Sequence, residues 1–120
     1  MTEKILIVED MEQDRKIVEK VLKEAGYQNL VFASNGEEGI EKAIAVVPDL
    51  IILDLGLPKK SGSEVHNTLK LHPRTKNIPI LFNTSLMKPG EDAGGGVNQS
   101  IVAKTSDAGD LLSRVREIIG

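Results

Sequence analysis

The chain has 120 residues, of which 40% are hydrophobic and 28% are charged, with a net charge of -3 and no cysteine. This length supports one domain, residues 1–120, around one hydrophobic core, and the lack of cysteine excludes disulfides, thiol catalysis and thiolate metal sites. The mild negative charge gives no support for direct nucleic-acid binding. No apolar run approaches the roughly 18 residues of a membrane span, and the first residues lack the apolar core of a signal peptide. We therefore expect a cytoplasmic protein without membrane insertion.

Short apolar runs alternate along the chain with segments of helical periodicity. Strands are predicted over residues 4–8, 30–33, 50–53, 78–82 and 100–103. Helices are predicted over residues 11–26, 35–47, 62–72 and 107–119. The periodicity puts Ile17 on the inner face of the first helix and Leu71 on that of the third. The alternation predicts a parallel sheet covered by helices on both faces, with right-handed crossovers.

The segment between the fourth and fifth predicted strands, residues 87–99 (MKPGEDAGGGVNQ), has a weaker helical signal. Pro89, followed by Glu91 and Asp92, could open a helix. The three consecutive glycines 94–96 would each cost about 1 kcal/mol relative to alanine inside it. We expect a short, frayed or mobile fourth helix.

Polar residues follow the predicted strands at their carboxyl ends, which is where function gathers in an open parallel sheet. In strand order they are Glu9 with Asp10, then Asp54, Thr84 and Lys104. If the first and third strands are neighbours, three carboxylates converge, and such a cluster repels itself unless a cation is present. Carboxylate oxygens with room for water suit Mg²⁺.

Such a site suits phosphoryl transfer. A carboxylate can act as a nucleophile towards phosphorus and give an aspartyl phosphate. Phosphoryl transfer mainly needs positioning and neutralisation of charge. Mg²⁺, the Lys104 ammonium and the Thr84 hydroxyl could each meet one phosphoryl oxygen.

With these residues in order, the chain resembles the response regulator receiver domains of two-component signalling, from KILIVED near its start to VREIIG at its end. The stretch ILDLGLPKKSG, residues 52–62, resembles the family's block around its phosphoacceptor, an aspartate followed by a hydrophobic residue, proline and a downstream glycine. The order and spacing of the five strand-end positions also agree with the family. The resemblance implies a doubly wound, flavodoxin-like (CheY-like) α/β fold with strand order 2-1-3-4-5.

The resemblance also implies a role for each matching residue. Asp54 is the expected phosphoacceptor, and Asp10, Asp54 and the backbone carbonyl of Gly56 are expected Mg²⁺ ligands, with Glu9 reaching the ion through water. Thr84 and Lys104 are expected to contact the phosphoryl group.

As for partners, the resemblance implies a histidine kinase or phosphotransfer protein as phosphodonor. A downstream protein or fused output domain would then respond to the surface around the fourth helix, fifth strand and fifth helix. Such a domain catalyses only its own phosphorylation and dephosphorylation, so it is not a metabolic enzyme. We expect a monomer or weak dimer.

Four positions depart from the family pattern. Thr105 follows Lys104 where the family has proline, so a trans peptide is expected there. Ile101 replaces an aromatic residue that turns inward on activation, and neither Gly56 nor Leu86 carries an acid or amide that could orient water. We expect dephosphorylation to proceed without assistance from side chains.

Alternative interpretations stay open. Glu9 and Asp10 could simply cap the first helix, and the whole chain could be a pseudo-receiver, an interaction module that is never phosphorylated. A phosphatase of the haloacid dehalogenase type would need Asp-x-Asp, but Gly56 stands where its second acid would be. A flavodoxin-like FMN carrier would need a hydroxyl- and glycine-rich loop after the first strand, where the two acids would repel a phosphate. His66 is interpreted as a surface residue without partner ligands.

Overall fold

The computed structural model describes residues 3–57, 60–84, 99–103 and 108–119, with the backbone alone for 84, 99–103 and 108–110. Its elements are β1 (Lys4–Val8), α1 (Glu12–Glu24), β2 (Asn29–Ala33), α2 (Gly36–Val46), β3 (Leu50–Leu53), α3 (Gly62–Leu71), β4 (Ile80–Thr84), β5 (Gln99–Ala103) and α4 (Ala108–Ile119). The strands form one parallel sheet in the order β2-β1-β3-β4-β5, which confirms the predicted fold. Helix α4 is the predicted fifth helix, and the helix predicted to open near Pro89 lies outside the described residues.

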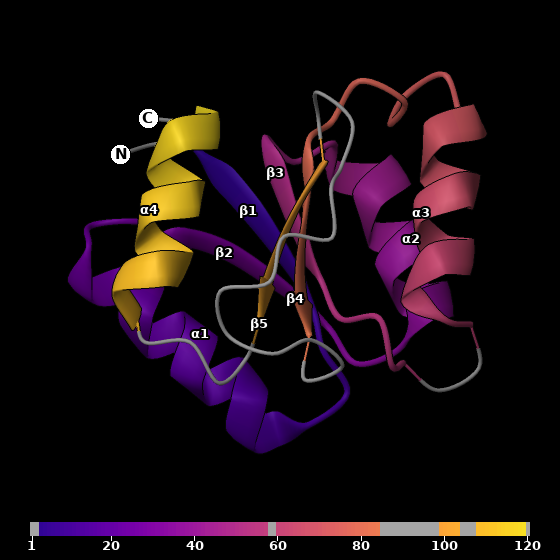
Figure 1. Ribbon diagram of the computed structural model, residues 1–120. Coiled ribbons are helices and arrows are strands. Elements are labelled where there is room, and N and C mark those ends of the chain that lie inside the picture. The colour runs from indigo at the N-terminus through magenta and orange to yellow at the C-terminus, as the bar shows by residue number, and fades with distance from the viewer. Residues whose placement is uncertain (1–2, 58–59, 85–98, 104–107, 120) are drawn as a thin grey trace.

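The helices form a layer on each face of the sheet, α1 and α4 on one and α2 and α3 on the other (Figure 1). Alternate side chains of each strand pack against opposite layers. One core cluster includes Leu6, Val8, Ile51, Leu53, Val65 and Leu69, and the other includes Ile5, Ile7, Val18, Leu22, Ile52 and Val115. Both faces of the central strands are thus buried, which explains their unbroken apolar runs. Among the described residues, no helix combines the length and apolar character needed to cross a bilayer.

Two helices begin at side-chain caps near the carboxyl edge of the sheet. Asn35 Oδ1 accepts a hydrogen bond of 2.9 Å from the Glu38 N–H at the start of α2, and Ser61 Oγ accepts one of 3.2 Å from the Glu64 N–H in α3. The Glu38 carboxylate reaches back to the Ser34 N–H at 2.6 Å, and this bond lowers the pKa of Glu38. These caps replace backbone partners that a helix start lacks.

Strand β4 begins later than the sequence predicted. The prediction began the strand at Ile78, but the Ile78 N–H donates to the Thr75 carbonyl at 3.0 Å and so closes a turn. Pro79 has no N–H to donate to a strand ladder. The strand therefore spans Ile80–Thr84, and Thr84 is its last residue and not the residue after it.

Three side chains also differ from their predicted exposure. Ile17 and Leu71, predicted to face inward, are 54% and 85% exposed. Leu71 lies two residues beyond the fully buried Leu69, and two residues turn a helix by about 200°. His66, predicted as a surface residue, is half-buried, and its ring centroid lies 5.6 Å from that of Phe82.

The two leucines of α3 offer a matched test of this packing. We expect Leu69→Ala to reduce the free energy of unfolding by about 2–5 kcal/mol because it leaves a cavity in the core. Leu71→Ala removes the same atoms from an exposed side chain and leaves no cavity. It should change the free energy of unfolding by less than about 0.5 kcal/mol. Urea denaturation of both variants measures the difference, and equal losses would contradict the assigned face of α3.

The start of α3 fits closely against the chain that follows β3. The Gly62 N–H donates to the Leu55 carbonyl at 2.9 Å. A Cβ atom at Gly62 would lie 2.6 Å from the Leu55 Cα and still closer to the Asp54 carbonyl oxygen. Only glycine therefore permits this approach between the helix and the loop after β3.

Substitution of two glycines tests this contact. Gly62→Ala should reduce the free energy of unfolding by about 1–3 kcal/mol because backbone atoms must move to accept the methyl group. Gly56→Ala is the control, since a Cβ there meets nothing within 4 Å. Chemical denaturation should show a loss for Gly62→Ala alone, and a neutral Gly62→Ala would mean that the loop yields without cost.

Candidate functional site

The pairing of β1 with β3 sets the position of the acids. Val8 lies opposite Leu53, and the next residue of β3's chain, Asp54, donates its N–H to the Val8 carbonyl at 3.1 Å. On the other side of β1, the Glu9 N–H donates to the Ala33 carbonyl at 3.0 Å. Glu9 and Asp54 therefore directly follow a pair of residues that lie opposite each other in the sheet. Backbone hydrogen bonds of the sheet hold both of them in place.

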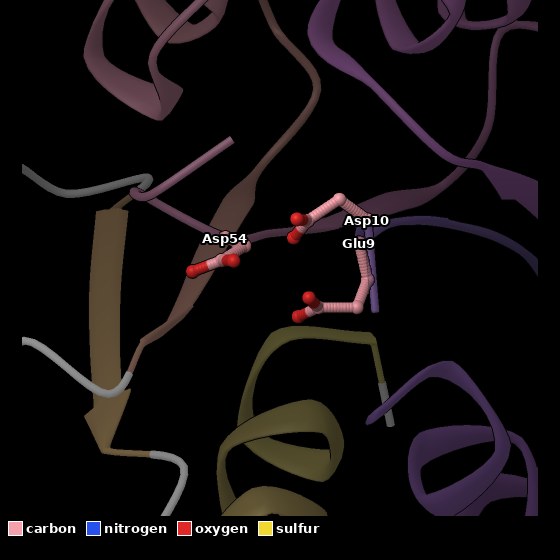
Figure 2. A group of neighbouring side chains, drawn as sticks. All are labelled: Glu9, Asp10 and Asp54. Carbon is pink, nitrogen blue, oxygen red and sulfur yellow. The ribbon is translucent and has the colours of Figure 1, made fainter. Parts of the chain in front are cut away.

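Three carboxylates meet at this edge of the sheet. One oxygen from each of Glu9, Asp10 and Asp54 can be chosen so that all lie within 4.8 Å of one another. Figure 2 shows the first two reaching from the end of β1 towards Asp54 after β3. Glu9 and Asp54 are only 2% and 6% exposed, and Asp10 is more accessible. The predicted convergence of the three acids is confirmed.

Each buried carboxylate accepts a hydrogen bond from the turn that follows it. Glu9 Oε1 accepts from the Met11 N–H, and Asp54 Oδ1 accepts from the Gly56 N–H, both at 3.3 Å. Buried carboxylates need such donors because burial otherwise penalises the charge. Helix α1 has Met11 as its N-cap and no side-chain cap. Neither acid is therefore the N-cap residue, although the Glu9 carboxylate does accept from the N–H of that residue.

Chemically, the cluster is an oxygen donor set for a hard cation. Like charges at this separation repel, most strongly where water is excluded. Carboxylates at low count, one of them accessible to water, match what Mg²⁺ takes from proteins. The residues present therefore fit this ion.

Arg15, a cation that the sequence analysis did not single out, contacts the backbone of two of the acids. Arg15 Nη1 donates to the carbonyl oxygens of Glu9 at 2.8 Å and Asp10 at 3.1 Å. The sequence did contain a signal for Arg15. It lies near the start of a predicted helix, where the positive end of the helix dipole disfavours a cation. Such a residue needs a local partner.

The remaining predicted residues are described only in part. Gly56 is exposed. Thr84 ends β4 opposite Ala103 of β5, and Ile101 lies opposite Phe82, with only the backbone described at Thr84 and in β5. Lys104, Leu86 and Thr105 lie outside the described residues, and so does the peptide bond predicted to be trans.

Comparison with curated proteins finds signalling regulators. The chain is 35% identical over 121 residues to the DNA-binding dual master transcriptional regulator RpaA of Synechocystis, covering 97% of this chain and 48% of RpaA. It is 34% identical over 92 residues to the polar-differentiation response regulator DivK of Brucella suis, covering 77% of this chain and 74% of DivK. It is 38% identical over 81 residues to the hybrid signal transduction histidine kinase D of Dictyostelium discoideum, covering 68% of this chain and only 5% of the kinase.

Comparison with solved structures finds the same fold. The chemotaxis protein CheY4 of Vibrio cholerae superposes with a TM-score of 0.84 at 27% identity, over 99% of this chain and 100% of CheY4. The receiver domain of the sensor histidine kinase PA1611 of Pseudomonas aeruginosa, which has a magnesium ion in its active-site cleft, superposes with a TM-score of 0.84 at 24% identity, over 100% of this chain and 99% of that one. The sequence matches the response regulator receiver domain over residues 5–116. With that match over most of its length, the chain belongs to the family of response regulator receiver domains.

Proposed function

We propose that this receiver accepts a phosphoryl group on Asp54, with Mg²⁺, from a histidine kinase or phosphotransfer protein. The observation that carries the proposal is the cluster of Glu9, Asp10 and Asp54 at the adjacent ends of β1 and β3. A pseudo-receiver has no need to hold two buried acids against each other's repulsion. Membership of the family supports the same role.

Four residues would hold the ion. Asp10 and Asp54 would bind it through carboxylate oxygens, Glu9 through water, and Gly56 through its carbonyl. The hydrogen bond between the Gly56 N–H and Asp54 Oδ1 supports this set, because it keeps the two residues in one tight turn. When bound, Mg²⁺ neutralises charge on the acids and on the incoming phosphoryl oxygens. The magnesium in the PA1611 receiver domain supports the choice of ion.

The chemical step is a displacement at phosphorus. An Asp54 carboxylate oxygen attacks, and a new O–P bond forms as the N–P bond of a phosphohistidine breaks. The electron pair of the broken bond returns to the imidazole nitrogen of the donor. With acetyl phosphate, the leaving group is acetate. The product is an aspartyl phosphate in either case.

Two further residues would contact the transferred group. Thr84 ends β4 at the same edge of the sheet as Asp54, and its backbone lies opposite Ala103, the residue that precedes Lys104 in the sequence. The Thr84 hydroxyl would donate to one phosphoryl oxygen and the Lys104 ammonium would pair with another. Both roles come from the family resemblance and belong to this proposal.

Receiver domains act between histidine kinases and downstream effectors. For this chain we propose a protein partner or a fused output domain, no direct contact with nucleic acid, and a monomer or weak dimer. We further propose that it works in the cytoplasm and catalyses only its own phosphorylation and dephosphorylation. The chain spans 48% of RpaA and 5% of the hybrid kinase, so more than half of each of these relatives lies outside the match.

The proposal is tested by intact mass after incubation with acetyl phosphate, with and without Mg²⁺. We expect the wild type to gain one phosphoryl group only with Mg²⁺, and Asp54→Ala to gain none. Asp49→Ala is the matched control, because Asp49 flanks the opposite end of β3 and its carboxylate accepts from the Lys4 N–H. That variant should be phosphorylated like the wild type.

The alternatives predict different outcomes. A pseudo-receiver gains no phosphoryl group although it folds, and the departures at Ile101 and Thr105 are what favour it. Phosphorylation that survives Asp54→Ala would move the acceptor to another residue. In a separate assay of phosphate release, rapid hydrolysis of a phosphate ester would favour the phosphatase.

A second prediction concerns how long the phosphoryl group persists. We expect slow dephosphorylation in the wild type, because Gly56 offers no side chain to orient an attacking water. Gly56→Asn introduces an amide where a Cβ has open space. It should speed dephosphorylation by roughly tenfold over Gly56→Ala, less than the ~100-fold that a positioned general base contributes. The decay of the phosphorylated mass measures both rates, and equal rates would contradict the explanation.

A further inference from the structure

Arg15 makes two contacts that helix stability does not explain. It lies in the first turn of α1, where its own N–H donates to the Met11 carbonyl at 2.9 Å. A cation there is opposed by the helix dipole. Its side chain turns back past the helix start, and Nη1 donates to two backbone carbonyls, those of Glu9 and Asp10.

Those carbonyls belong to two of the three acids of the site. The turn after β1 is held from three directions, by the Glu9 N–H on the Ala33 carbonyl, by the Met11 N–H on Glu9 Oε1, and by Arg15. The contact with Arg15 includes the Asp10 carbonyl and so extends the support to the more exposed of the two acids. Fixing the peptide groups on either side of a Cα fixes the direction in which its side chain leaves.

We propose that Arg15 is a positioning residue of the site, whose guanidinium holds the turn of Glu9 and Asp10 so that both carboxylates face Asp54. The proposal rests on the proposed Mg²⁺ site and adds to it. Without the guanidinium, mutual repulsion would turn the accessible Asp10 carboxylate outward into water. The ion would then have to reorganise the turn before binding.

A purely electrostatic role for Arg15 predicts the opposite sign. A positive charge near a cation site weakens binding of the cation, so removing it would tighten Mg²⁺ binding. Positioning predicts that removal weakens binding. The two explanations are therefore separated by the direction of the change.

The neighbouring lysine provides a matched control. Lys16, the next residue of α1, carries the same charge, but its ammonium pairs with Glu12 at 3.2 Å, and both side chains are 70% exposed. Lys16→Met removes the charge without touching the turn after β1. Arg15→Lys keeps the charge and a donor on a shorter side chain.

The experiment measures the Mg²⁺ dissociation constant by calorimetry for the wild type, Arg15→Met, Arg15→Lys and Lys16→Met, at low and high salt. We expect Arg15→Met to raise it about tenfold, the lower end of the loss seen when support behind metal ligands is removed. Arg15→Lys should recover part of the affinity for Mg²⁺. Lys16→Met should leave that affinity unchanged or raise it slightly. High salt should not abolish the difference, because it comes from geometry.

A second readout needs no metal. The Met11 N–H donates to Glu9 Oε1, so its hydrogen exchange, followed by NMR in metal-free protein, reports on the turn. Arg15→Met should speed exchange at Met11, and Lys16→Met should not. Equal or tighter Mg²⁺ binding by Arg15→Met overturns the positioning role and leaves the proposed function standing. A wild type that binds no Mg²⁺ overturns both.

Discussion

Repulsion among Glu9, Asp10 and Asp54 is the constraint that the surrounding structure has to meet. Their oxygens come within 4.8 Å, and two of the three side chains are nearly buried. The sheet resists the repulsion because β1 and β3 cannot slide apart. A slip of one residue would turn every side chain of a strand to the opposite face, and both faces are packed against helices. The pairing of Val8 with Leu53 therefore fixes the positions of Glu9 and Asp54, the residues that follow them.

Beyond the strand ends, support comes from one helix on each face of the sheet. On one face, α1 reaches the turn of Glu9 and Asp10 through the Arg15 guanidinium. On the other, α3 abuts the loop of Asp54 through Gly62, with no side chain between them. The first support is the long side chain of Arg15, and the second is a close backbone contact that Gly62 permits because it has no side chain. Both supports contact backbone atoms of the two turns and not the carboxylate oxygens.

Apolar patterning predicted the strands but wrongly placed Ile17 and Leu71 on inner helix faces, and it failed where local chemistry decides. Continuous apolar runs identified the strands, since burial on both faces leaves no polar alternation. The order of the strands came from the family resemblance, because periodicity cannot tell which strands are neighbours. The start of β4 was missed because the turn at Ile78 and Pro79 overrides an apolar run. Arg15 was missed because its partners are backbone carbonyls, which every residue carries.

In the proposed function, the departure at Ile101 limits how a change at Asp54 could reach an output surface. An aromatic ring at that position would turn as a unit, but isoleucine has none. Thr84 and Ala103, like Phe82 and Ile101, are partners in the β4–β5 ladder. In the proposed function, a shift of Thr84 towards a phosphoryl group would therefore pull on β5 through backbone hydrogen bonds. Such coupling would shift β5 as a whole and not a single side chain. A partner that responds to the shift would therefore have to contact several residues along β5.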